Sequence, residues 1–423
     1  EAEKEKDWWV EAQSRVHKRS AERVLGVCER NGGVFLKAAQ YLSTLGGALP
    51  KEWTGTLSRA QDSAPVSNRS AVEEIILAEL GKKVEEVYAE FDWKPLAAAS
   101  IAQVHRAKLL SNGREVAVKV QHPGLQRRSL GDVVTLRVIA AVVAWWWPEF
   151  EFRWVLPDLE ESLAREMDFI QEAITASRAG RVLESHHRVH VPEVEWEWTT
   201  RRLLTMEFIK GRPATDTKYL EEISAPSREV AAATIRALAT LINVHGLCHC
   251  DPHPGNVMVE GLENGEWRVV LLDHGMYRRI SRSFREAYCS LWQAMVQGDT
   301  ALGVRACRAL GSPEPEFTFD ALSLALTFRP AGSSSSLGTR ISQEERERLR
   351  DKYAKTTAED IQNLMRSLPR DMLFVMRSTN LLRGLNFALG GSSRDRFLAI
   401  ADAATEGAVV SALSSSVAAL QIW

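Results

Sequence analysis

The sequence predicts an α+β protein in which a small lobe of strands and helices precedes a larger, mostly helical lobe. Two short β-prone runs, 96–107 and 115–120, lie in the first half of the chain. The segments before residue 60 and after residue 213 instead place apolar residues at the three- and four-residue spacings of helices. A chain of 423 residues is about three times a typical domain of ~150 residues, which excludes one small module.

The amino-acid composition is that of a globular protein and excludes several other classes. Hydrophobic residues make up 45% and charged residues 26% of the chain, as in ordinary globular proteins. The 53 Lys and Arg against 55 Asp and Glu give a net charge of -2, so no global field attracts nucleic acid, and no nucleic-acid partner is expected. Five cysteines, an odd number, favour a reducing compartment over a disulfide framework. Because the first residue is Glu1, any targeting segment is expected outside this sequence.

No run reaches the ~20 apolar residues expected of a membrane span. The nearest are Gly407–Trp423 and Val138–Trp147. Both are interpreted as core helices, with an interfacial membrane contact as the alternative.

The secondary structure is predicted from periodicity and from turn residues. Ser70 and Glu73 form a capping-box pattern for a helix over Ala71–Leu80, which Gly81 ends. The expected strands, in chain order, are Leu96–Ala107, Glu115–Val120, Val189–Val194, Arg202–Ile209, Asn256–Val259 and Trp267–Leu272. Ser111-Asn112-Gly113 and Glu263-Asn264-Gly265 mark hairpin turns, and Ala331–Gly338 is expected as a flexible loop. The predicted domains are an N-terminal helical extension (1–70), a strand-containing lobe with inserted helices (71–210) and a helical lobe (211–423).

The most informative segment is His249–Asn256, HCDPHPGN, followed by Asp273 in LLDHG. Asp251 and Asn256 stand five apart, and Asp273 follows a hairpin, which is the spacing of the catalytic Asp, the Asn and the metal-binding Asp of kinases. Asn256 and Asp273 supply oxygen ligands for Mg²⁺, and Asp251 can orient or deprotonate a hydroxyl. Alone, the segment could equally be a Pro/Gly-rich turn whose Asp binds backbone donors.

An upstream lysine strengthens the kinase interpretation. Lys119 ends Val116-Ala117-Val118-Lys119, the pattern of the strand whose Lys binds the nucleotide phosphates, although any edge strand can end in Lys. Met206-Glu207-Phe208 then stands in the place of the hinge between kinase lobes. The order of these elements favours a nucleotide site over coincidence.

With these residues in place, the chain resembles the UbiB/aarF-domain family of atypical kinases and, within it, the aarF-domain-containing kinase 1 type. The motifs that carry the resemblance are PLAAASIAQVHRA (Pro95–Ala107), VAVKVQHPG (Val116–Gly124), PEFEFRW (Pro148–Trp154), EMDFIQEA (Glu166–Ala173), HCDPHPGN and VLLDHGMY (Val270–Tyr277). The resemblance implies a protein-kinase-like bilobal fold, ATP or ADP with Mg²⁺ as cofactors, and a membrane-associated, mitochondrial or plastid location. It also implies a role in isoprenoid-quinone and lipid homeostasis.

The segment expected to cover the phosphates is Ala97-Ala98-Ala99-Ser100, where kinases have a glycine-rich loop. Alanine restricts both positive φ and close approach of the backbone to phosphate. An unusual nucleotide pose and slow phosphoryl transfer or ATP hydrolysis are therefore expected. The alternative is a strand of small residues that simply packs.

Only about eight residues separate Gly275 from a helix predicted to start at Ser283, with Glu286 as its capping partner. A long segment that docks a peptide is therefore missing, which favours a small-molecule or lipid substrate. Four arginines of this region could bind anionic head groups or form a solvated basic face, namely Arg278, Arg279, Arg282 and Arg285.

The N-terminal KxGQ motif of the family aligns with Lys37-Ala38-Ala39-Gln40, where Ala39 replaces glycine. The resemblance implies that Lys37 and Gln40 meet Glu166 and Asp168 of the ExD motif and limit access of protein substrates. The partner expected for Lys119 is Glu172, with Glu166 as the alternative, on one helix over Leu159–Ser177.

His249 is expected to pack beneath Asp251, and a zinc site at Cys248, His249, Cys250 and His253 is disfavoured by the ligand spacing. The leading hypothesis is a slow atypical kinase or ATPase that acts on a membrane lipid or quinone precursor, with peripheral membrane contact. The alternative is a nucleotide-binding pseudokinase that serves as a scaffold or lipid chaperone; a helical interaction protein without nucleotide is a third reading. A homodimer is left open.

Overall fold

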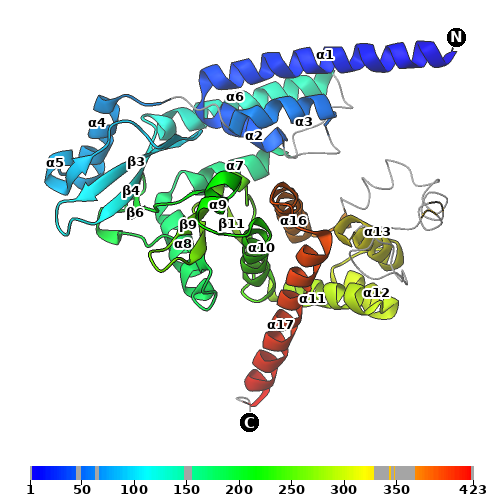
Figure 1. Cartoon of the computed structure of the whole chain (residues 1–423). Helices are drawn as coiled ribbons and strands as arrows, with labels where there is room; N and C mark the ends of the chain where they lie inside the picture. The colour runs from blue at the N-terminus through cyan, green and yellow to red at the C-terminus, as the bar shows by residue number, and fades with distance from the viewer. Residues whose placement is uncertain are drawn as a thin grey trace. The chain divides into compact units, whose positions relative to one another are not determined.

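The computed structural model describes residues 2–43, 49–61, 66–146, 155–327, 343, 347 and 367–420 (Figure 1). The chain forms two compact units. Unit 1 comprises Glu1–Ile174 and Glu193–Phe208, and unit 2 comprises Thr175–Pro192 and Ile209–Trp423. The mixed helix and strand architecture confirms the predicted fold class. The finer division at residues 70 and 210 stays a prediction.

Unit 1 begins with a helical subdomain, α1 (Ala2–Asn31), α2 (Gly33–Ser43), α3 (Lys51–Leu57) and the 3₁₀ turn η1 (Ser58–Gln61). Gly32 and Gly33, both at positive φ, lie where α1 ends and α2 begins. The shared core consists of Leu25, Cys28, Leu36, Ala39, Leu57 and Ala60. Ala39, the substituted position of the KxGQ-like motif, is thus a packed core residue.

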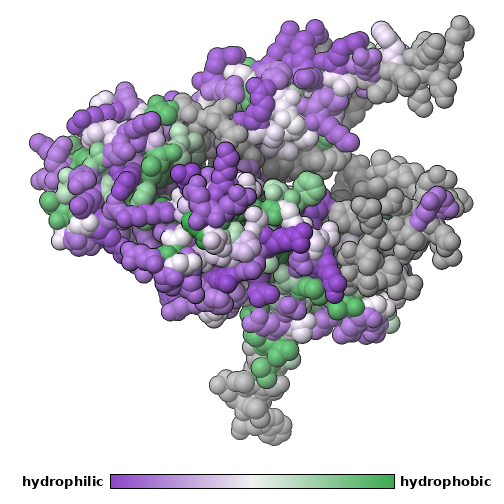
Figure 2. Space-filling view, in the orientation of Figure 1, coloured by the Kyte–Doolittle hydropathy of each residue, from purple (hydrophilic) through white to green (hydrophobic). Residues whose placement is uncertain are grey.

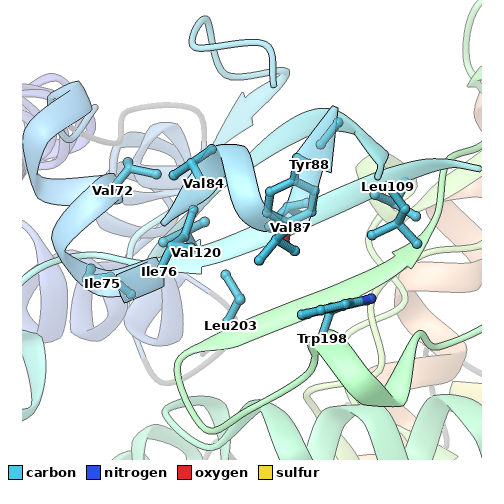
Figure 3. Close-up of a cluster of buried hydrophobic side chains, with 13 residues drawn as sticks. Val72, Ile75, Ile76, Val84, Val87, Tyr88, Leu109, Val120, Trp198 and Leu203 are labelled. Carbon is cyan, nitrogen blue, oxygen red and sulfur yellow. The ribbon is translucent and has the colours of Figure 1, made fainter. Parts of the chain in front are cut away.

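A five-stranded antiparallel sheet follows, with the order β1-β3-β4-β6 and β2 added to β3. Its strands are β1 (Tyr88–Phe91), β2 (Ala97–Ala98), β3 (Ala102–Leu109), β4 (Glu115–Gln121) and β6 (Leu203–Glu207). Helices α4 (Arg69–Leu80) and α5 (Val84–Val87) cover it, as Figure 3 shows for the cluster of Val72, Ile75, Ile76, Val84, Val87, Tyr88, Leu109, Val120, Trp198 and Leu203. Gly113, at φ 71°, makes the predicted β3–β4 turn.

The start of α4 differs from the prediction. Asn68, not Ser70, is the N-cap, and its side chain accepts a hydrogen bond from the Ala71 amide at 3.0 Å. Asn68 has the extended backbone of a cap residue, whereas Ser70 is already helical and donates to Asn68 at 3.0 Å. Gly81, at φ 65°, ends the helix as predicted.

The inserted helices also differ from the prediction. The expected single helix over Leu159–Ser177 is two helices, α7 (Val155–Glu166) and α8 (Phe169–Leu183). The break occurs because the Asp168 carboxylate accepts a hydrogen bond from the Ile170 amide at 3.1 Å and caps the second helix. All of the motif 148–154 lies outside the described residues.

Helix α6 (Leu125–Trp146) differs from the sequence prediction in its apolar length and in its exposure. Among the described helices it is the one long and apolar enough to cross a membrane by length and composition. The run that begins at Val138 was expected in the core, yet Val138 and Trp145 are exposed. The helix packs on one side only, against α2 and α7.

Unit 2 contains the sheet β5-β10-β9-β7 and the strand pair β8 with β11. Its strands are β5 (Val189–His190), β7 (Arg212–Pro213), β8 (Leu247–His249), β9 (Val257–Gly261), β10 (Trp267–Leu271) and β11 (Tyr277–Arg279). Its helices are α9 (Thr217–Glu222), α10 (Ser227–Asn243), α11 (Arg282–Gln297), α12 (Thr300–Ala309), α13 (Pro315–Thr327), α16 (Arg370–Ala388) and α17 (Ser393–Leu420). The predicted loop 331–338 lies outside the described residues.

Helix α10 lies at the core of unit 2 and packs closely on α17. A Cβ at Gly407 would stand 2.2 Å from the Asn243 carbonyl oxygen, so only glycine permits this approach. Beyond it, Val409 and Leu413 are exposed, and apolar surface gathers on α17 in Figure 2. Over the side chains that the structure describes in this run, residues 407–413, the helix is therefore buried on one side and exposed on the other.

The start of α11 and its arginines differ from the prediction. Ser281, not Ser283, is the N-cap and accepts a hydrogen bond from the Phe284 amide at 3.2 Å. Arg282 binds Glu286 at 2.7 Å and the Ser411 carbonyl at 3.0 Å, and Arg285 binds the Ser411 hydroxyl at 3.2 Å. These two arginines hold α11 to α17, instead of forming a basic face.

Candidate active site

In unit 1, Lys119 and Glu172 form the expected ion pair. The Lys119 ammonium lies 2.7 and 2.8 Å from the two carboxylate oxygens of Glu172. The side chains are only 15% and 3% exposed, and the ammonium also lies 5.1 Å from the centre of the Phe169 ring. Alternation along β4 buries Val116 and Val118, and the first turn of α8 supplies Glu172. The predicted partner of Lys119 is confirmed as a contact, and the catalytic roles of both residues remain predictions.

The KxGQ-like motif meets the ExD motif through one of its two polar residues. Lys37 on α2 lies 2.7 Å from Glu166, and both side chains are about nine-tenths buried at 11% and 10% exposure. Ser162 donates a second hydrogen bond to Glu166 at 3.0 Å. Gln40 instead donates to the Ala60 carbonyl at 2.9 Å, because α2 packs on η1 at that position. Asp168 caps α8 and lies 3.6 Å from Arg201, so the expected meeting of Gln40 with Asp168 is not what the structure shows.

The alanine segment forms a tight hairpin with β3. Ala97 pairs with Val104 and Ala98 with Gln103, and the Ala99 amide donates to the Ala102 carbonyl at 2.7 Å. None of the alanines has a positive φ, so the hairpin needs no glycine. Ser100 is buried, whereas Ala97 and Ala99 are exposed. The segment is regular strand and turn, and its contact with nucleotide stays a prediction.

The segment predicted to be the hinge, Met206-Glu207-Phe208, lies at the C-terminal end of unit 1. Met206 and Glu207 belong to β6, and the chain leaves unit 1 after Phe208. The Glu207 amide donates to the Glu193 carbonyl at 2.8 Å and the Phe208 amide to the Glu115 carbonyl at 3.3 Å. A nucleotide base therefore cannot take a hydrogen bond from either amide without displacing one of these bonds.

In unit 2, the loop after β8 places Asp251. The Asp251 amide donates to Nδ1 of His249 at 3.3 Å, which confirms the expected packing of His249 beneath it. His249 is buried and stacks on Tyr277 with ring centres 4.6 Å apart. Burial lowers the pKa of His249, so the ring is held neutral and can accept this bond.

Asn256 and Asp273 lie together at one end of the β9–β10 hairpin. The 3₁₀ turn η3 (Pro254–Asn256) presents Asn256, and the Leu272 amide donates to the Asn256 carbonyl at 3.0 Å. The Asn256 side-chain nitrogen lies 3.4 Å from an Asp273 carboxylate oxygen, and the other oxygen accepts from the Gly275 amide at 2.9 Å. A half-turn of the Asn256 carboxamide presents its oxygen beside that carboxylate.

This oxygen pair fits Mg²⁺, which prefers carboxylate and carbonyl oxygens and keeps several ligands from water and phosphate. No cluster of three His, Cys, Asp or Glu side chains that could hold a metal occurs in the described parts of the chain. The protein therefore offers a partial ligand set, as expected where a nucleotide supplies the rest.

Arg377 is a neighbour of the site that the sequence did not indicate. It lies on α16, and its guanidinium Nη2 is 3.4 Å from Asp251 Oδ1. The two residues are 126 positions apart, and no local motif surrounds Arg377.

The His274 imidazole, in the place of the usual kinase Phe, is buried, lies 3.0 Å from the Leu271 carbonyl and stacks on Tyr277.

Comparison with known proteins gives a consistent result. Residues 59–305 match the ABC1 atypical kinase-like domain. The chain is 38% identical to the Xenopus laevis AarF domain-containing protein kinase 1 over 381 residues, which cover 90% of this chain and 73% of that protein. The Mus musculus protein of the same name is 36% identical over 394 residues, covering 92% of this chain and 74% of that protein.

A Dictyostelium discoideum relative, the probable serine/threonine-protein kinase abkD, is 37% identical over 94% of this chain and 57% of its own length. Among solved structures, the Rv3197–erythromycin complex from Mycobacterium tuberculosis has a TM-score of 0.53 at 23% identity. The similarity covers 90% of this chain and 95% of that one, and it supports the fold.

Proposed function

Because the chain belongs to the ABC1 atypical kinase-like family, we propose that it binds ATP or ADP with Mg²⁺ and acts as a slow kinase or ATPase. The observation that carries the proposal is the pairing of Asn256 with Asp273 at 3.4 Å in unit 2, a partial Mg²⁺ ligand set on the loops of kinase spacing. The buried Lys119–Glu172 pair of unit 1 supports it, since a lysine held in this way offers its ammonium to phosphate oxygens.

Each residue has a chemical role in this proposal. Bound Mg²⁺ would neutralise the phosphate charge between Asn256 and Asp273. Asp251 accepts the proton of the attacking hydroxyl or water and orients its oxygen. Lys119 binds phosphate oxygens, and Glu172 keeps its side chain in one position. His249 supports the Asp251 backbone from below.

The substrate that we propose is a small molecule or lipid. Residues 276–281 alone separate Gly275 from α11, and three of them form β11, which pairs with β8. This segment is too short to offer a peptide-docking surface. The names of the Dictyostelium relatives, probable serine/threonine-protein kinases, favour protein substrates and make them the competing class. A mitochondrial role in lipid or isoprenoid-quinone homeostasis is proposed from the family resemblance.

A second candidate is a nucleotide-binding pseudokinase that serves as a scaffold or lipid chaperone. The observation that favours it is the ion pair between Arg377 and Asp251 at 3.4 Å, because the guanidinium engages the carboxylate that would accept the proton of the attacking group. For catalysis, Arg377 must release Asp251 or turn to the phosphates.

The experiment is phosphate release from ATP with Mg²⁺ by the wild type and by Asp251→Asn, with Arg377→Gln in parallel. Loss of the general base should slow release at least ~100-fold. Equal release by the wild type and Asp251→Asn favours the pseudokinase. Casein or histone can be tested as protein substrates. The proposal of a non-protein substrate would be contradicted if either is phosphorylated faster than ATP is hydrolysed and Asp251→Asn abolishes that phosphorylation.

A further inference from the structure

Helix α6 presents an apolar face that no other described element covers. Five residues at spacings of three and four form an outward stripe, namely Leu130, Val134, Val138, Val142 and Trp145. They are exposed by 52% to 78%, and Trp146 beside them is 64% exposed. Side chains at these spacings lie on one side of a helix. The stripe therefore runs over four turns without a charged residue.

The opposite side of α6 is fixed to the protein. Leu125 and Ser129 are buried, and Val133 and Leu136 pack on a cluster formed by residues of α2 and α7. The Arg137 guanidinium binds both carboxylate oxygens of Glu160 on α7, at 2.6 and 2.5 Å. The helix thus cannot rotate to bury the stripe without breaking these contacts.

We propose that the outward stripe inserts into an anionic lipid bilayer, with α6 lying in the plane of the membrane. Twenty-two residues make a helix about 33 Å long, enough for a row of side chains to enter the acyl region together. Trp145 and Trp146 end the helix, and tryptophan favours the boundary between head groups and acyl chains. Arg127 and Arg128 are exposed in its first turn, where they can bind lipid phosphates.

A lipid surface fits this face better than a protein does. A stable protein interface needs about 800 Å² and 20–30 residues on each partner, with a polar rim. The stripe is a single row of five large apolar side chains on one helix, which is far fewer than the residues that such an interface needs. Lipid requires no complementary shape. A transmembrane orientation of α6 conflicts with its packing. One side of the helix contacts α2 and α7, so only the other side is free to contact lipid.

This inference deepens the proposed membrane-lipid substrate by naming the surface that reaches it. Binding is measured without nucleotide, so a failure here leaves the nucleotide proposal standing. The full chain is floated with phosphatidylcholine vesicles that contain 30 mol% phosphatidylglycerol, and with vesicles of phosphatidylcholine alone. The variants are Val138→Glu and Trp145→Ala on the stripe. The matched control is Leu77→Glu on α4, an exposed leucine of the same unit.

The wild type and Leu77→Glu should both bind to anionic vesicles. The variant that combines Val138→Glu with Trp145→Ala should have a partition coefficient at least tenfold lower than that of the wild type. Binding that is equal in all variants, or no binding of the wild type, overturns the proposal. A wild-type dimer that Val138→Glu converts to a monomer, without vesicle binding, would show that the stripe joins two copies.

A second measurement does not depend on a charged substitution. The five native cysteines are buried, so Val138→Cys and Leu77→Cys can each be labelled with an environment-sensitive fluorophore. The emission at position 138 should shift to the blue on anionic vesicles and be quenched by brominated lipids, while that at position 77 stays unchanged. Identical behaviour at both positions contradicts insertion of the stripe.

Discussion

The ion pair between Lys119 and Glu172 gives the sharpest energetic prediction for unit 1. At 2.7 Å and with exposures of 15% and 3%, the pair is almost fully removed from water. Removing one partner leaves the other charge buried, which costs about 3–5 kcal/mol. Replacing both by apolar residues leaves no buried charge and costs much less. We therefore expect Glu172→Leu alone to destabilise unit 1 by at least about 3 kcal/mol, and Lys119→Met with Glu172→Leu by clearly less.

The assay is hydrogen exchange of the β3 and β4 amides, which reports the opening of unit 1 separately from unit 2. About 3 kcal/mol raises the exchange rate of these amides roughly 150-fold. The control is Glu73→Ala, which removes an exposed ion pair with Arg69 at 2.8 Å and should change stability by about 0.5 kcal/mol or less. The reasoning is refuted if Glu172→Leu changes the exchange rates no more than Glu73→Ala does. It is also refuted if adding Lys119→Met to Glu172→Leu does not bring the exchange rates back toward those of the wild type.

Two further predictions concern the alanine hairpin and the buried histidine. Ala98→Gly should change the ratio of ATP to ADP dissociation constants, measured by calorimetry with Mg²⁺, while costing only about 0.5–1 kcal/mol of stability; an unchanged ratio in the folded variant means that β2 does not touch phosphate. The pKa of His249 is lowered in the fold, so its stabilising contribution is present above the unfolded pKa of about 6.5 and is lost as pH falls. The melting temperature should therefore fall less between about pH 7.5 and 5.5 in His249→Gln than in the wild type, and equal slopes would show that His249 does not titrate in this way.

Local motifs predicted the contact between Lys119 and Glu172, whereas the starts of two helices were predicted wrongly. Glu172 was preferred to Glu166 as the partner of Lys119 because Glu166 was already assigned to the ExD motif, and the structure shows the Lys119–Glu172 contact. The caps at Asn68 and Ser281 were missed by two residues each. Several Ser and Asn side chains can serve as caps, and the backbone conformation decides which one does.

Tertiary contacts decided what the sequence could not. The apolar run beginning at Val138 has the composition of a core helix, and only the positions of α2 and α7 determine that one side stays exposed. Arg377 reaches Asp251 from 126 positions away, so no spacing could indicate it. The contact of Gln40 with Ala60 depends on how α2 packs on η1, which the KxGQ-like pattern does not specify.

The central claim is that Asn256 and Asp273 hold Mg²⁺ for a nucleotide, and calorimetric titration with ADP tests it most directly. The wild type and Asp273→Asn are each titrated with and without Mg²⁺, and the melting curve of the variant verifies its fold. The wild type should bind ADP at least ~10-fold more tightly with Mg²⁺, because the metal offsets the repulsion between carboxylate and phosphate. Asp273→Asn should lose that dependence. Equal Mg²⁺ dependence in the wild type and the variant would contradict the account.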